Sequence, residues 1–134
     1  MGYESSLHLV GVKIKDESIQ LVRAMLKTGK VRVPSPLRFF LERVVLGSDN
    51  FLAFKASEDG SDPYVPDEEE GTVPALHGKW YEAELFATWL KQHSEKGGRI
   101  ILHSLEADGA AWGWEFDGRG RMRPLGLRQI GKWG

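Results

Sequence analysis

The first apolar run of the chain has the two-residue alternation of a β-strand. It covers residues 6–14, where Leu7 and Leu9 occupy one phase while His8 and Val10 occupy the other. Because leucines and valines fill both phases near its start, we expect this strand to lie inside a sheet rather than at its edge.

Three later segments repeat their apolar residues at the spacing of a helix. The first covers residues 16–27 and begins at Asp16, a helix-capping residue type. The second begins at Ser35-Pro36 and is predicted over residues 35–46, with the apolar stripe Leu37, Phe40, Leu41, Val44 and Val45. The third is predicted over residues 80–93, with Tyr81, Leu85, Phe86, Trp89 and Leu90 on its apolar face.

The remaining periodic segments predict strands. Residues 51–57 form one of them, and residues 99–106, 111–117 and 121–125 form an antiparallel meander. Asp108-Gly109 and Asp117-Gly118-Arg119-Gly120 supply its two turns. Trp112, Trp114 and Phe116 share one phase, which indicates a core face, and Pro124 favours an edge position for the last strand.

This order of elements predicts an α+β fold. We expect an antiparallel or mixed sheet of about five strands with three helices packed mainly on one face. A length of 134 residues suits one domain, residues 1–134, with a single core.

The composition removes several functional classes. The absence of cysteine excludes disulfide frameworks, thiolate metal sites and cysteine nucleophiles. No apolar run approaches the roughly 20 residues of a membrane-spanning helix, and the start of the chain lacks the pattern of a secretory signal. We therefore expect a cytoplasmic protein that does not bind membranes.

The net charge of −1 conceals an uneven distribution. Residues 56–71 hold seven acidic and no basic side chains, together with two prolines and two glycines, which predicts a mobile acidic loop at 58–71. Its candidate contact residues for a basic partner are Tyr64, Asp67, Glu68, Glu69 and Glu70. The alternative is a solvated connection between the two halves of the chain.

Basic residues gather near the C-terminus. Arg119, Arg121 and Arg123 belong to the last turn and strand, where they could contact a protein partner. In the alternative interpretation they form a solvated edge that deters strand addition. A third possibility is single-stranded nucleic acid, which such a stripe would bind together with exposed aromatic rings.

The histidines are the acid–base candidates near neutral pH. His8 and His103 each lie within a predicted strand, and with Glu106 and Asp108 they form an alternative ligand site or small enzyme centre. The competing interpretation is two half-buried histidines with backbone or water partners. No helical zinc motif, nucleophile elbow or phosphate loop is present, so we expect no cofactor and no resident metal, and we assign no catalytic residue.

The opening Met1-Gly2-Tyr3 and the segment Asp108-Gly109-Ala110-Ala111-Trp112 resemble those of small uncharacterised proteins of bacteria and their phages. The resemblance covers about half of the chain, and the two early helices depart from it. It implies a similar layout and adds nothing on mechanism. The leading hypothesis is a non-catalytic, regulatory or protein-interaction domain whose contacts are the acidic loop and the arginines of the C-terminal strand.

Overall fold

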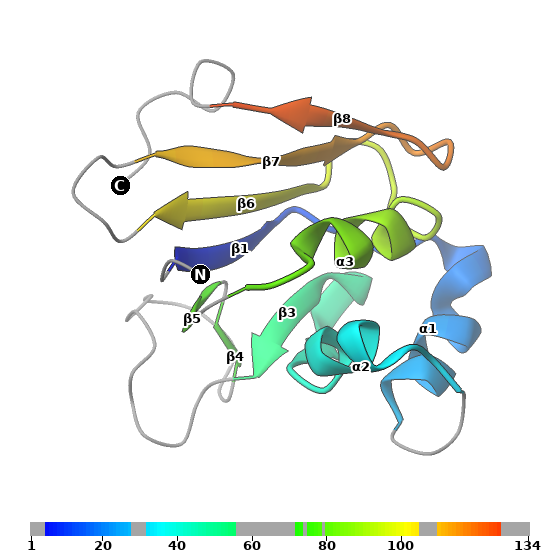
Figure 1. Cartoon of the computed structure of the whole chain (residues 1–134). Helices are drawn as coiled ribbons and strands as arrows, with labels where there is room; N and C mark the ends of the chain where they lie inside the picture. The colour runs from blue at the N-terminus through cyan, green and yellow to red at the C-terminus, as the bar shows by residue number, and fades with distance from the viewer. Residues whose placement is uncertain are drawn as a thin grey trace.

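A computed structural model describes residues 5–27, 32–55, 72–73, 75–78, 80–104 and 110–126 of the chain. Its larger sheet has five antiparallel strands in the order β5 (Ala75–Gly78), β1 (Ser5–Val10), β6 (Arg99–Ser104), β7 (Ala111–Phe116) and β8 (Met122–Leu125) (Figure 1). The predicted C-terminal meander is confirmed, and β1 lies inside the sheet as its two apolar phases indicate. β8, which contains Pro124, forms one edge.

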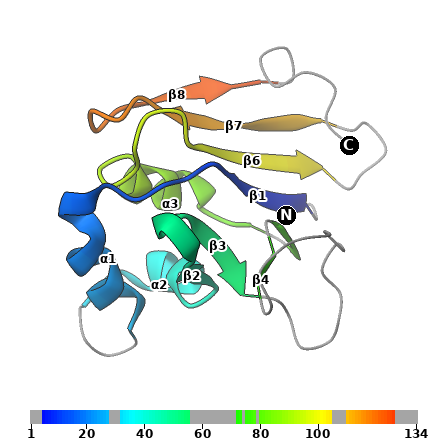
Figure 2. The same cartoon turned by 180° about the vertical axis from the view of Figure 1, so that it is seen from behind.

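A smaller antiparallel sheet has the order β2 (Val44–Leu46), β3 (Leu52–Lys55) and β4 (Thr72–Val73). The helices are α1 (Ile19–Leu26), α2 (Ser35–Leu41) and α3 (Ala83–Leu90), and short 3-10 helices occupy Asp16–Ser18 and Ser48–Asn50. Helices and smaller sheet lie on the same side of the larger sheet (Figures 1 and 2), which confirms the α+β class. None of the helices in the described residues is long and apolar enough to cross a membrane.

One hydrophobic core joins the two sheets and the helices. Leu7 and Leu9 of β1 contribute to it from the inner face of the larger sheet, and Phe54 contributes from the smaller sheet. Between α2 and α3 the rings of Phe40 and Phe86 stack with centroids 4.8 Å apart and an interplanar angle of 8°. Ring stacking of this kind adds to the stabilisation by burial, so it fixes the two helices against each other.

The second helix is shorter than predicted. It ends at Leu41, and Val44 and Val45 belong to β2, where they pair with Phe54 and Ala53 of β3. Two consecutive β-branched residues lose side-chain freedom in a helix and pack well in a strand. The helical prediction was wrong here because an apolar residue at position 44 suits a buried strand as well as the buried side of a helix, and Val44 is buried in β2.

The third helix begins at Ala83 rather than at residue 80, and Tyr81 does not belong to a core face. The side chain of Tyr81 is 61% exposed. Glu82, at the helix start, has φ +59° and ψ +35°, so the backbone turns sharply between Tyr81 and the helix. The preceding strand β5 was not predicted, because its four residues carry too little periodicity to mark them.

Gly113 in β7 provides a test of the packing between β6 and β7. A Cβ at this position would overlap the carbonyl oxygen of Ile100, a backbone atom that cannot move without breaking the strand pair. We predict that Gly113→Ala lowers the free energy of unfolding by about 3 kcal/mol or more, measured by urea denaturation. Gly78→Ala is the matched control: its new Cβ would meet only the Trp80 ring at 3.4 Å, so its cost should be far smaller. Equal losses in the two variants would contradict this packing.

Candidate functional site

Three loops meet at one end of the larger sheet, around the turn between β7 and β8. Gly118 in this turn has φ +80°, and a Cβ there would lie 2.8 Å from the backbone nitrogen of Lys96, so both conformation and contact require glycine. The Lys96 loop is tied in turn to the segment that follows β1. The Glu95 N–H donates to the Lys13 carbonyl (2.8 Å), and the Lys15 N–H donates to the His93 carbonyl (2.8 Å).

Asp117 fixes the turn itself. Its Oδ1 accepts hydrogen bonds from the backbone N–H groups of Arg119 (2.7 Å) and Arg121 (3.1 Å). The first of these bonds is the main reason that the pKa of Asp117 is held below its usual value; the second bond and the two arginine charges act in the same direction. The turn is therefore ordered from within, and it presents the exposed side chains of Arg119 and Arg121.

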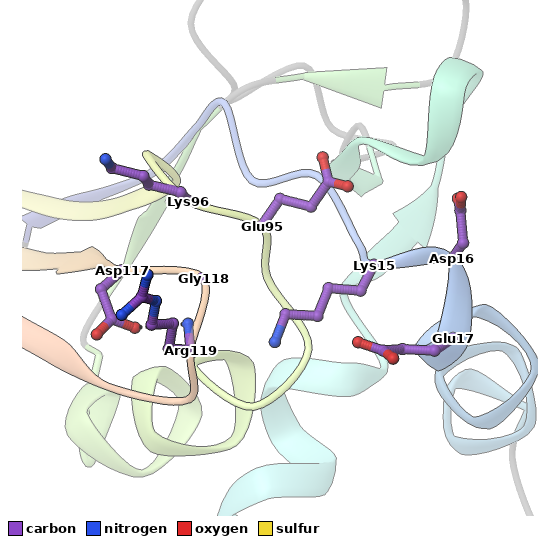
Figure 3. Close-up of a pocket in the computed structure, with 8 residues that line it drawn as sticks. All are labelled: Lys15, Asp16, Glu17, Glu95, Lys96, Asp117, Gly118 and Arg119. Carbon is purple, nitrogen blue, oxygen red and sulfur yellow. Dashed lines mark hydrogen bonds between the residues drawn. The ribbon is translucent and has the colours of Figure 1, made fainter.

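The meeting loops border two adjoining, solvent-open hollows, which we call the hairpin-end groove. The larger, of about 720 Å³, is lined by Lys15, Asp16, Glu17, Glu95, Lys96, Asp117, Gly118 and Arg119. In Figure 3, Lys15 and Glu17 reach into it from one wall, and Arg119 belongs to the opposite wall. The smaller hollow, of about 400 Å³, shares Lys96 and Asp117 with the first and extends to Arg121 and Arg123.

Arg123 is held within the sheet by an ion pair. The Glu115 carboxylate forms ion pairs with two arginines. Its Oε1 lies 2.8 Å from Nη2 of Arg123, and its Oε2 lies 2.8 Å from Nε of Arg99. Burial alone would raise the pKa of Glu115, but the hydrogen bonds and charges of the two guanidinium groups outweigh it and lower the pKa. Neither Arg119 nor Arg121 forms an ion pair with a carboxylate in the described part of the chain.

The three predicted arginines therefore lie together in one groove, but they do not share a surface with the tryptophans. Trp112 and Trp114 pair with Leu102 and Ile100 on the inner face of the sheet. Glu115 and Arg123, which pair with each other, face the opposite side. A strand surface that combines base stacking with basic charge is thus not formed, because the rings and Arg123 point to opposite faces.

The other predicted contact residues lie outside the described residues. These are Tyr64, Asp67, Glu68, Glu69 and Glu70 of the acidic segment, and Glu106 and Asp108 beside the predicted histidine site.

The structure brings His8 and His103 to the same face of two neighbouring strands. Ser6 of β1 pairs with His103 of β6 on one side and with His77 of β5 on the other. His8 follows two residues later and therefore shares this face, and its Nε2 is hydrogen-bonded to the Ser6 hydroxyl at 2.8 Å. Three imidazoles from three strands thus surround one buried serine; we call these four residues the histidine cluster. His77 was missed because β5 was not predicted.

The surroundings of His8 favour the neutral form of its ring. Burial, and then the charges of His103 and His77, lower the pKa of His8 to about 4. Such a ring is a weak general base near neutral pH. Within the described residues, no group of three or more metal-ligating side chains is arranged to hold an ion.

A third hollow was not predicted from the sequence. It has a volume of about 300 Å³ and lies between α2 and the turn before α3, lined by Pro36, Phe39, Tyr81 and Glu82. We call it the aromatic cleft. No local pattern marks it, because its two walls come from segments that are separate in the sequence.

Comparisons of the chain with protein-family models, with curated proteins and with solved structures found no match. The similarity to small bacterial and phage proteins therefore stays a prediction.

The low pKa of His8 predicts an acid-sensitive fold. Because the unfolded chain protonates this ring near its ordinary pKa of 6.5 and the folded chain only near 4, protons favour unfolding. The contribution of His8 to stability should be complete above about pH 6.5 and should fall as the pH approaches 4. The variant His8→Gln should show a smaller decrease in the free energy of unfolding with falling pH, measured by urea denaturation between pH 7 and pH 4. Burial and the charge of Lys15 also lower the pKa of His93, and this group contributes with Glu115 and Asp117 to the pH dependence common to both proteins. Identical decreases in both would contradict the assignment.

Proposed function

We propose that the chain is a non-catalytic protein-interaction domain that binds its partner through the hairpin-end groove. The observation that carries this proposal is the rigid display of Arg119 and Arg121. Asp117 holds the backbone of both residues, Gly118 packs the turn against Lys96, and both guanidinium groups remain exposed beside a large open hollow.

The charges of the groove favour a protein as the partner. Basic Lys15, Lys96 and Arg119 share the larger hollow with the carboxylates of Asp16, Glu17, Glu95 and Asp117. A nucleic-acid backbone would gain from the cations but would be repelled by the carboxylates. A protein surface can present both signs in register, and this complementarity supplies specificity.

The acidic segment at 58–71 is the second contact in this proposal, on sequence grounds alone. Deleting residues 58–70 should leave the described fold intact and weaken capture of the partner. A cytoplasmic location stays a prediction, made from the lack of a recognisable targeting pattern together with the cysteine-free composition.

A second candidate function is the binding of a small ligand at the histidine cluster. It is favoured by the convergence of His8, His77 and His103 around Ser6. NMR titration with a library of small fragments tests it. Joint shifts of the three imidazole resonances would support a shared site, and independent or absent shifts would remove it.

Reversal of the two exposed charges tests the principal proposal. The double variant Arg119→Glu, Arg121→Glu should reduce capture of the partner from the native host, quantified by mass spectrometry, by about tenfold or more, because like charges across an interface cost several kcal/mol. Circular dichroism should show an unchanged fold, since both side chains are exposed.

Arg23→Glu, Arg32→Glu is the matched control. It makes the same change in net charge at two exposed arginines that do not line the groove. Equal capture by the groove variant and the wild type would refute the proposal, as would an equal loss in the control.

A further inference from the structure

The aromatic cleft between α2 and the turn before α3 has firm apolar walls. The Phe39 ring meets the Phe40 ring edge-on (5.5 Å, 88°) and the Trp80 ring at 6.0 Å and 66°. Trp80 is itself anchored to β1, because its indole N–H donates to the Ser5 carbonyl at 3.1 Å. Phe39 nevertheless remains 40% exposed. A ring that is fixed on one side and open on the other is preorganised for binding, since little freedom is lost on contact.

The opposite wall presents an exposed aromatic ring and a carboxylate. Tyr81 is the most exposed large hydrophobic side chain of the described residues. Glu82 lines the cleft with its backbone in the left-handed region, which L-residues with long side chains rarely adopt. Glycine would adopt this conformation without strain, so a glutamate here carries a cost in backbone energy.

Of the two charged side chains near the cleft, Arg43 has a partner within it and Glu82 has no ion pair in the described part of the chain. Arg43 lies over the Phe39 ring, with its guanidinium carbon 3.7 Å from the centroid, and its Nη1 donates to the Phe39 carbonyl. Glu82 has no ion pair with any residue that the structure describes. The carboxylate beside an otherwise apolar cleft is therefore the charge available to a ligand.

We infer that the aromatic cleft binds a peptide segment of a protein partner, with an apolar side chain inserted between Phe39 and Tyr81 and a neighbouring Lys or Arg paired with Glu82. A volume of about 300 Å³ is at the lower limit of ligand pockets, which suits a single anchoring side chain rather than a large cofactor. Anchors of this kind, seated in apolar pockets and bordered by a charge, commonly dominate protein interfaces. The inference rests on the proposed function as an interaction domain, but it uses none of the residues of the hairpin-end groove.

The test is a selection of displayed random peptides on the wild-type protein, followed by fluorescence titration of synthetic peptides that represent the enriched sequences. We expect these sequences to share an aromatic or large aliphatic residue next to Lys or Arg. Tyr81→Ser should weaken their binding at least tenfold. Glu82→Gln, which keeps the shape of the side chain, should weaken it severalfold, and the loss should diminish at high salt.

Leu21→Ser is the matched control, because Leu21 is a similarly exposed apolar residue on α1 and does not line the cleft. Thermal unfolding of every variant verifies the fold. The inference is overturned if enriched peptides bind Tyr81→Ser as well as wild type, if they carry acidic residues beside the anchor, or if no sequence is enriched. Sedimentation that shows a dimer lost in Tyr81→Ser would overturn it too, since the occupant would then be a second copy of the chain.

The groove variant Arg119→Glu, Arg121→Glu distinguishes this inference from the proposed function. It should bind the selected peptides like the wild type while it loses the native partner. If it keeps the native partner and the peptides also bind as expected, the hairpin-end groove is wrong and the aromatic cleft stands.

Discussion

The antiparallel pairing of β1 with two strands at once is the constraint on which the other features depend. Ser5 pairs with Gly78 of β5 and with Ser104 of β6, and the register continues along the strand without a break. A shift of one residue would move Leu7 and Leu9 out of the core and place the polar phase of β1 inside it. The burial of these leucines therefore selects the register, and the register in turn places His8, His77 and His103 on the same outer face.

The segment that follows β1 is hydrogen-bonded to the smaller sheet and to the groove, so the register of β1 also fixes their positions. After Gly11 the chain leaves the larger sheet, and the Val12 carbonyl accepts the N–H of Leu52 at 2.9 Å. The Ile14 N–H donates to the Asn50 carbonyl at 2.9 Å, and the next residue, Lys15, bonds to the end of the α3 segment. The wall of the groove that bears Lys15 is thus a direct extension of the central strand, and its position follows from main-chain bonds.

The sequence predicted those features whose cause is local. The meander from β6 to β8 has turn residues and alternation within each strand, and the position of β1 follows from its two apolar phases. The strand β5 has four residues and becomes a strand only by pairing with β1, which lies far away in the sequence. The strand β2 pairs locally with β3, but its valines continue the apolar spacing of the preceding helix, so the sequence pattern extended the helix over them. The same limit applied to the sites. His8 and His103 could be related because each lies in a long predicted strand. His77 on β5 and Tyr81, which lies in the turn before α3, could be placed only by the tertiary structure.

The arrangement of charge in the groove shows that the net charge of the chain describes this surface poorly. Glu115 forms ion pairs with both Arg99 and Arg123, and Asp117 Oδ1 accepts two backbone N–H groups of the turn. These acids stabilise the scaffold, so they are less available to a partner than Glu17 or Glu95. Arg119 and Arg121 lie on the same short turn and keep their guanidinium groups exposed. The proposed partner would encounter a local excess of available positive charge on the turn and of negative charge across the hollow, although the chain as a whole has a net charge of −1. In the proposed interaction, recognition would depend on the relative positions of the charges, because a net charge of −1 on this chain contributes little long-range attraction.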